Sequence, residues 1–415
     1  MTRIHLNSKG LMLASSLIVG AFGGAAMAED AAVDSATAPV AMPKMDFLDA
    51  AYVPGLDGVV VVGHHGMVGK LTVGADSAKV SVIEDAPDQD FTALARYGDD
   101  KALLGSSTGR LYSFDGKTIS EIAALSEYDE PILDIAVDGA GVWVVGARGL
   151  VAYSADGSDF EALEIRDVTM PVTQMPGGQP ADWYFGVSNI DSETIEFTAT
   201  VGGEPAIPDE HYIMYPDEGF VQVQTDLDMD PPPTIGFKFN PGPPFRLGDV
   251  SWNVVIVKAG TVTIAGEFGM IFQSQDNGES WVRRDVRIVP REPEPAYWMA
   301  GAQRGEQIWL TGAAGVSAHS EDAGVTWMDN PKPGREGIFG ISLENGDSPV
   351  ISGAVGLIGN LNGRKWSLAD RTALKLLSWL RTPVAMPDGS LLITGGRATA
   401  IRFRGGKFTR VPVVY

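Results

Sequence analysis

Apolar residues occur along this chain in short runs of about four to six residues, rich in Val and Ile and separated by polar turns. Typical runs are Val59–Val62, Val142–Val145 and Val262–Ala265. Each run ends at a glycine, and a short turn, a second run and another polar turn follow it. Because no run continues at the 3.6-residue spacing of a helix, the pattern predicts β-strands joined by tight turns.

The pattern repeats, and one glycine in each repeat marks its position. The separations between successive marker glycines are 42, 41, 120, 46, 41 and 42 residues, and the glycines are Gly63, Gly105, Gly146, Gly266, Gly312, Gly353 and Gly395. A period near 41 residues matches the four short strands of one propeller blade. The sequence therefore predicts an all-β fold, a seven-bladed β-propeller of four-stranded antiparallel blades over residues 46–415.

The separation of 120 residues leaves an irregular segment, residues 165–250. It holds 12 of the 26 prolines and has 14 acidic against three basic residues. One interpretation is an acidic, proline-rich insertion. The other is a degenerate blade, because Trp183-Tyr184-Phe185-Gly186 falls 40 residues after Gly146; this alternative would make the propeller eight-bladed.

Two repeats contain the same longer motif, S-x-D-x-G-x-[ST]-W. Its residues are Ser274, Asp276, Gly278 and Trp281 in one repeat, and Ser320, Asp322, Gly324 and Trp327 in the next. A carboxylate can accept backbone N–H bonds in a hairpin turn, glycine permits a positive φ, and an indole packs between strands. The motif resembles the Asp-box of the BNR repeat, and the resemblance implies a structural turn at the blade periphery, away from the central channel.

The N-terminal residues 1–28 have the features of a cleaved signal peptide. Arg3 and Lys9 precede an apolar stretch, and Ala26-Met27-Ala28 fits the small-x-small rule for signal peptidase. Residues 29–45 are expected to form a flexible leader. The chain contains no cysteine, which excludes disulfides and thiolate sites and, together with export, predicts a periplasmic or extracellular location.

Charge is distributed unevenly along the chain. The formal net charge is −22, which disfavours nonspecific binding to nucleic acid. Residues 360–415 nevertheless hold ten Lys or Arg against two Asp. This basic last blade could contact acidic loops of a protein or anionic headgroups of a membrane, and such charge separation mainly affects orientation and association rate.

With these repeats behind an export signal, the chain resembles the photosystem II stability and assembly factor family, most clearly over Val262–Trp366. The resemblance implies a propeller that binds a membrane-protein subunit with the help of an arginine-rich patch. The candidate partner-binding residues here are Arg397, Arg402, Arg404 and Arg410. The acidic surplus and the segment 165–250 depart from the family's photosynthetic members.

The enzyme alternative is a sialidase-like propeller that acts on or binds carbohydrate, because such propellers also carry Asp-boxes. No Arg-Ile-Pro motif occurs, and the first arginine after the leader is Arg96. No P-loop, dinucleotide-binding or HExxH motif is present either. We therefore predict no catalytic residues and no cofactor, and a non-catalytic protein that binds an envelope membrane protein or complex.

Three further groups have both a functional and a structural interpretation. His64 and His65, in the turn from Gly63 to Gly66, could bind a metal or simply form a polar turn. Asp226-Leu227-Asp228-Met229-Asp230 lacks the glycine of a calcium loop and precedes three prolines, so we expect a solvated loop. We predict no metal site. Five large apolar residues could form a docking stripe or core strand positions: Leu374, Leu376, Leu377, Trp379 and Leu380.

Overall fold

The computed structural model describes residues 45–415, apart from 140, 164, 166–167, 175–181, 185–195, 202–203, 216–219, 224–233, 240–249, 285, 288–294 and 346–347. The predicted signal peptide (residues 1–28), most of the leader and the Asp226–Asp230 segment lie outside the described residues. Strands dominate, and the helical elements in the described part are short 3₁₀ turns such as η1 (Pro54–Leu56). None of them has the length and apolar character of a membrane span.

The strands of the first three blades follow one another directly along the chain. Blade 1 contains β1 (Asp49–Val53), β2 (Gly58–Val62), β3 (Val68–Val73) and β4 (Ala78–Val82). Blade 2 contains β5 (Phe91–Tyr97), β6 (Lys101–Ser106), β7 (Arg110–Phe114) and β8 (Ile119–Ala124). Blade 3 contains β9 (Ile132–Asp138), β10 (Gly141–Gly146), β11 (Val151–Ser154) and β12 (Glu161–Ala162).

The last four blades repeat the same order. Blade 4 contains β20 (Trp252–Lys258), β21 (Thr261–Gly266), β22 (Ile271–Ser274) and β23 (Val282–Arg284). Blade 5 contains β25 (Trp298–Arg304), β26 (Gln307–Gly312), β27 (Ser317–Ser320) and β28 (Trp327–Asp329). Blade 6 contains β29 (Ile338–Ser342), β30 (Val350–Gly353), β31 (Ile358–Asn362) and β32 (Lys365–Leu368). Blade 7 contains β33 (Leu380–Ala385), β34 (Leu391–Gly395), β35 (Thr399–Arg404) and β36 (Lys407–Arg410).

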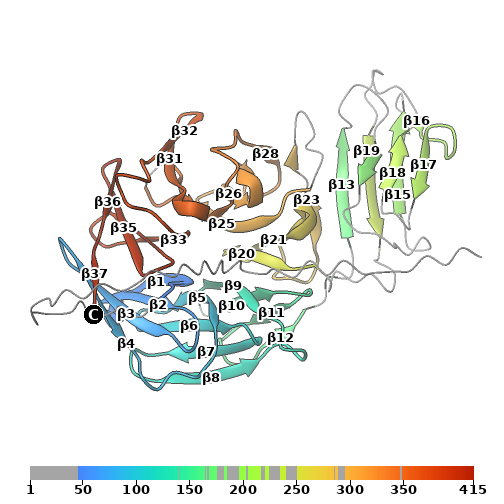
Figure 1. The fold of residues 1–415 in the computed structure, drawn as a ribbon. Helices are drawn as coiled ribbons and strands as arrows, with labels where there is room; N and C mark the ends of the chain where they lie inside the picture. The colour runs from blue at the N-terminus through green and yellow to red at the C-terminus, as the bar shows by residue number, and fades with distance from the viewer. Residues whose placement is uncertain are drawn as a thin grey trace, which may run out of the picture. The chain divides into compact units, whose positions relative to one another are not determined.

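The first strands of the blades form a closed ring. β1 contacts β5, β5 contacts β9, β9 contacts β20, and the series continues through β25, β29 and β33 back to β1. Figure 1 labels six of these strands, β1, β5, β9, β20, β25 and β33, toward the centre of the ring. The seven-bladed, four-stranded antiparallel propeller is therefore confirmed. The eight-bladed alternative is wrong, because blades 3 and 4 touch directly through β9 and β20.

Three blades gain a fifth strand at their outer edge, always parallel to the fourth. β37 (Val413–Val414) pairs with β4, β24 (Val286–Arg287) with β28, and β13 (Val168–Gln174) with β23. Each comes from the segment of chain before or after a blade. β37 therefore closes the ring by the same pairing that joins successive blades elsewhere.

The remaining described strands of the irregular segment pair mostly with one another. β13 pairs with β19 (Thr234–Phe239), and β19 pairs on its other side with β15 (Glu196–Val201). β15 in turn pairs with β16 (Glu204–Pro205). A separate sheet joins β14 (Asp182–Tyr184), β18 (Phe220–Val223) and β17 (Tyr212–Tyr215). Trp183 therefore lies on a strand that belongs to no blade of the ring.

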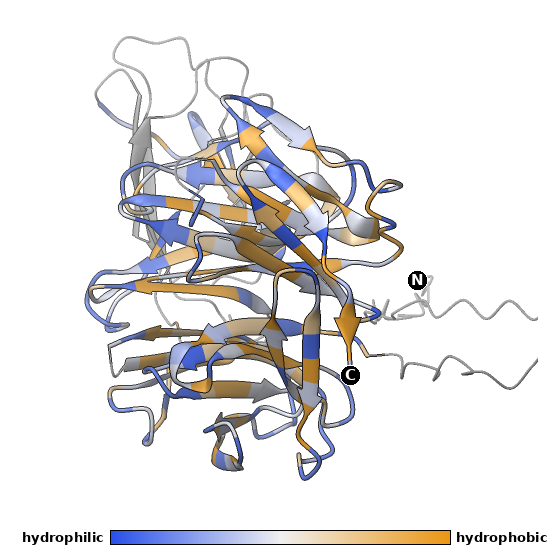
Figure 2. Cartoon of the chain, turned by 90° about the vertical axis from the view of Figure 1, so that its left-hand side faces the viewer, coloured by the Kyte–Doolittle hydropathy of each residue, from blue (hydrophilic) through white to orange (hydrophobic). Residues whose placement is uncertain are grey.

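Apolar side chains pack between adjacent blades. One cluster combines Val60 and Val62 of blade 1 with Phe91 and Leu104 of blade 2, and similar clusters lie between other pairs of blades. Figure 2 shows hydrophobic colour concentrated along the strands and hydrophilic colour in many connecting loops. Because each blade buries both faces of its sheet, the strands are continuous apolar runs instead of alternating ones.

Candidate functional site: the top face of the propeller

Antiparallel pairing places the connections of every blade on two opposite faces. We call top face the one that carries the turns between the second and third strands and the loops from each fourth strand to the next blade. The bottom face carries the turns between the first and second and between the third and fourth strands. Repeated motifs and variable side chains are divided unequally between the two faces.

Six of the seven marker glycines lie where a top-face turn begins. Close packing of the turn against the backbone before the blade's first strand explains why these positions are glycine. A Cβ atom there would lie 2.0–2.3 Å from a carbonyl oxygen just before the same blade's inner strand. The pairs are Gly63 with Asp46, Gly146 with Pro131, Gly266 with Ser251, Gly312 with Tyr297, Gly353 with Gly337, and Gly395 with Trp379. The 41-residue glycine period thus marks a repeated backbone contact at the top of each blade.

At the tip of the same six turns, an exposed residue other than glycine has a positive φ between 50° and 58°. These six tip residues are His65, Arg148, Phe268, Ala314, Val355 and Arg397. In each turn the residue before the tip accepts a backbone hydrogen bond from the residue three positions later, at 2.9–3.3 Å. The residue after the tip also has a positive φ, which makes these type I′-like turns.

Such a conformation favours Gly or Asn and is rare for bulky residues. Phe268, in η4 (Glu267–Gly269), and Val355, in η6 (Ala354–Gly356), adopt it with 53% and 65% of their surface exposed. Ala314 occupies the same place in η5 (Ala313–Gly315). These side chains neither favour the backbone conformation of the turn nor contribute to the buried core. Their presence at strained positions therefore points to a role at the surface.

The top face is also divided by charge. The loops after blades 1 and 2 expose five carboxylates that form no ion pair with another described residue: Glu84, Asp85, Asp88, Glu127 and Asp129. The loop after blade 6 and the turn of blade 7 carry the cations Arg371, Lys375 and Arg397, and Arg371 contacts Glu336 at 2.8 Å. A ligand on this face therefore meets opposite charges on two different arcs of the ring, which adjoin where blade 7 meets blade 1.

Polar groups just inside the channel join neighbouring blades. Asp49 of blade 1 accepts a hydrogen bond from Leu94 N of blade 2 at 2.8 Å and one from Thr382 of blade 7 at 3.2 Å. Asp134 of blade 3 accepts one from Val255 N of blade 4 at 2.9 Å. Arg381 donates from Nε to Leu48 O at 2.7 Å. These side chains therefore act as clamps between blades.

Asp49 and Asp134 are both largely buried, although each residue keeps part of its surface accessible to solvent. Burial raises the pKa of Asp134 to about 7, and nearby Asp49 adds to the rise. Burial also raises the pKa of Asp49, against the effect of Arg381. The hydrogen bonds that both groups accept come from the neighbouring blades.

His64 and His65 lie on the top face, in the turn between β2 and β3. His64 Nδ1 lies 3.0 Å from Asp90 Oδ2, and the backbone N–H of His65 donates to Asp90 Oδ1 at 2.8 Å. No group of three or more potential metal ligands occurs among the described residues. The two contacts of Asp90 hold the turn in place, and the His65 side chain stays exposed.

The S-x-D-x-G motifs form turns on the bottom face. In blade 4, Asp276 accepts bonds from Ser280 N at 2.9 Å and Ser274 Oγ at 2.7 Å. The Trp281 indole N–H donates to Gly278 O at 3.1 Å. The second turn repeats this pattern with Asp322, Thr326, Ser320, Trp327 and Gly324. The hydrogen bonds to Asp276 and Asp322 lower the pKa of both carboxyl groups, against the opposing effect of burial.

The four predicted partner-binding arginines do not gather in one place. Arg404 ends β35, about 17 Å of extended chain from its first residue Thr399, and Arg397 lies in the turn before that strand. Arg402 donates to the carbonyl oxygens of Gly74 and Ala75 in blade 1, and Arg410 donates to Leu374 O and Lys375 O. Only Arg397 belongs to the ring of top-face tips.

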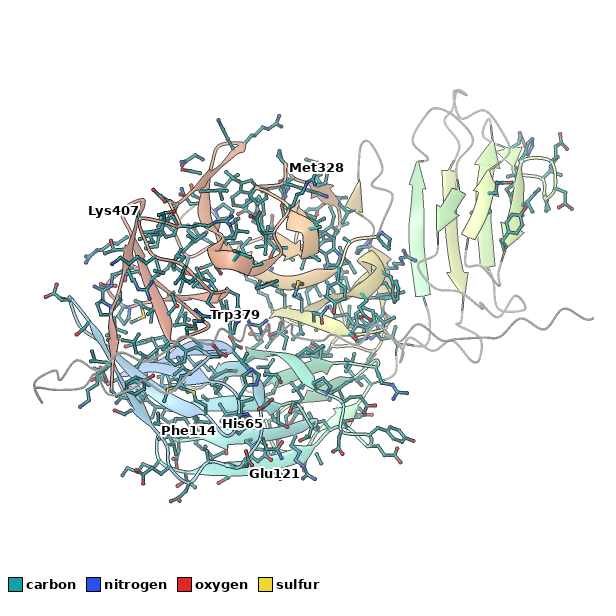
Figure 3. All side chains as sticks on the ribbon, viewed as in Figure 1. His65, Phe114, Glu121, Met328, Trp379 and Lys407 are labelled. Atoms are coloured by element: carbon teal, nitrogen blue, oxygen red, sulfur yellow. The ribbon has the colours of Figure 1, made fainter. Side chains whose placement is uncertain are left out.

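The apolar stripe separates into core and surface positions. Leu376 and Leu380 are buried, whereas Leu377 is 77% exposed. Trp379 is half-buried and lies close to Gly396, whose hypothetical Cβ would be 3.0 Å from the indole nitrogen. Figure 3 shows Trp379 toward the centre of the ring, with Lys407 and Met328 at its outer margin. Leu377 and Trp379 thus add apolar surface to the top face.

Comparison with known proteins supports the fold alone. No protein-family model and no curated protein matches the chain. Similar solved structures include YCF48 from Cyanidioschyzon merolae, with a TM-score of 0.53 and 14% identity over 88% of this chain and 97% of that chain. The WD40 β-propeller domain of Doa1 has a TM-score of 0.52 and 10% identity over 87% and 94%. YCF48 bound to D1 peptide has a TM-score of 0.45 and 10% identity over 75% and 77%. At these identities the chain is similar to propellers of different kinds.

Proposed function

We propose that this chain is a non-catalytic propeller that binds a protein partner through its top face. One observation carries the proposal: six exposed side chains of varied chemistry occupy αL tips around the ring. A rigid scaffold that presents variable loop residues is a common arrangement for binding. Leu377, Trp379 and the divided charge add apolar and polar contacts of the kind that protein interfaces use.

We further propose that the chain is exported and that its partner is an envelope membrane protein or complex. The N-terminal leader pattern and the absence of cysteine support this location. The sequence resemblance to the photosystem II assembly factor family supports the role, and the Asp276 and Asp322 turns are then Asp-boxes of a BNR repeat. In this proposal the Asp-boxes hold the blades, while the top face recognises the partner.

A photo-crosslinking amino acid placed at Phe268 or at Val355 tests this proposal in the native host. We expect both positions to capture the same envelope protein. The same group at Val325, a 43% exposed residue on the bottom face, serves as the matched control. Equal capture from both faces would contradict the proposal. Release or binding of a sugar by the purified protein would instead favour the sialidase-like alternative.

A further inference from the structure

A cavity of about 190 Å³ opens on the top face between blades 2 and 3. Its walls come from the loop that follows β8, from the top-face turn of blade 3 and from the end of β12. Leu125, Leu150, Val151 and Leu163 provide apolar lining. An enclosed apolar cavity of roughly 150 Å³ is large enough to hold benzene, so this cavity, which is open to solvent and has polar as well as apolar walls, has the volume for a leucine- or phenylalanine-sized side chain.

Carboxylates of the loop after β8 lie along one wall of the cavity. Glu127 and Glu130 line the cavity, and Asp129 lies between them in the same loop. Arg148, the tip residue of the blade 3 turn, also lines the cavity and is 3.1 Å from Glu130, so their charges offset one another. Glu127 and Asp129 stay exposed and form no ion pair with another described residue.

The negative charge continues beyond the cavity on the side of blade 1. The loop after blade 1 exposes Glu84, Asp85 and Asp88 on the same face. An incoming cationic segment is thus attracted to this part of the face and oriented toward the cavity.

We propose that this cavity is a subsite for a basic segment of the partner protein, which inserts one apolar side chain between flanking lysines or arginines. The inference rests on the proposed top-face binding function and specifies one of its contacts. The apolar anchor supplies contact area, and the carboxylates supply charge complementarity. The neighbouring tip Arg148 is held by Glu130, which keeps its own charge from repelling the segment.

The test uses a fluorescein-labelled pentapeptide, Lys-Lys-Leu-Lys-Lys, and fluorescence anisotropy with the whole purified protein at low ionic strength. We expect saturable binding that weakens as salt is added, because exposed charges are screened. Replacing the central leucine of the peptide with serine should weaken binding at least tenfold. The reversed peptide Glu-Glu-Leu-Glu-Glu should not bind. Equal binding of the leucine and serine peptides, or tighter binding of the acidic one, would overturn the inference.

Two variants localise the site. Ala162→Phe, which fills the cavity from β12, should lower the affinity for the basic peptide at least tenfold, whereas Ala124→Phe, at an exposed position of β8, should leave the affinity unchanged. The double variant Glu127→Lys and Asp129→Lys should lower the affinity still further. The double variant Asp100→Lys and Glu306→Lys makes the same charge change on the bottom face and should have a much smaller effect. Unchanged binding in both cavity variants would overturn the subsite. If Phe268 crosslinks a partner while no basic peptide binds, the subsite fails and the top-face function stands.

Discussion

The two faces of the propeller use repetition in opposite ways. On the bottom face, the turns at Asp276 and Asp322 repeat both side chains and hydrogen bonds. On the top face, the turns repeat the backbone conformation, while the tip changes from His65 through Phe268 to Arg397. Where side chains repeat, they serve the fold. Where only the backbone repeats, the side chains are available for recognition.

The largest expected difference between the faces concerns stability. Trp327 is 1% exposed and its indole N–H bonds to Gly324 O at 2.9 Å. Trp327→Ala should therefore lower the free energy of unfolding by about 3–5 kcal/mol, as measured by urea denaturation. The neighbouring Met328→Ala, at a 51% exposed position, should change it by less than about 0.5 kcal/mol. A small effect at Trp327 would mean that the bottom-face motif does not hold the blade.

A smaller loss of stability is expected when a marker glycine of a top-face turn is replaced. Gly353 has an extended conformation that any residue adopts, but a Cβ would lie 2.1 Å from Gly337 O. Gly353→Ala should thus lower the free energy of unfolding by about 2–3 kcal/mol through the clash alone. Gly305 meets nothing within 4 Å and has a φ of +64°. Gly305→Ala should cost about 1–2 kcal/mol, through backbone strain alone.

The raised pKa of Asp134 predicts that the stability of the protein depends on pH. Its folded pKa of about 7 lies above the ordinary value, so folding favours its protonated form. The contribution is fully present below about pH 4 and is lost as pH rises through 7. The effect is on the order of 2 kcal/mol, reduced by solvent in the channel. Asp134→Asn should therefore flatten the slope of unfolding free energy between about pH 4 and 7, as measured by urea denaturation at several pH values.

The smallest stability change is expected at the tips themselves. Phe268→Gly and Val355→Gly relieve the strained conformation but increase the freedom of the unfolded chain, so stability should change by no more than about 1 kcal/mol. Partner capture should fall nonetheless. Ala259→Gly and Ala323→Gly, at positive φ on the bottom face, are the matched controls. Unaltered capture by the double tip variant would remove the distinction between the faces.

Much of the architecture followed from local pattern. The glycine period predicted seven blades because the same backbone contact recurs at Gly63, Gly266 and Gly353. The sequence also pointed to the turn of His64 and His65. It did not identify the other tips, although the recurring G-x-x-G spacing was the available signal. A tip residue such as Val355 has no motif of its own, since its position depends on the φ of the folded turn.

The sequence alone determined the strands, the period and the uneven charge, because these depend on neighbours within a few residues and on composition. Only the tertiary structure decided which residues share a face. It separated Arg397 from Arg404 along β35, turned Arg402 toward the carbonyls of blade 1, and brought Leu125 to the same cavity as Leu163. Such placements depend on ring closure and on packing between blades, which join residues distant in the chain.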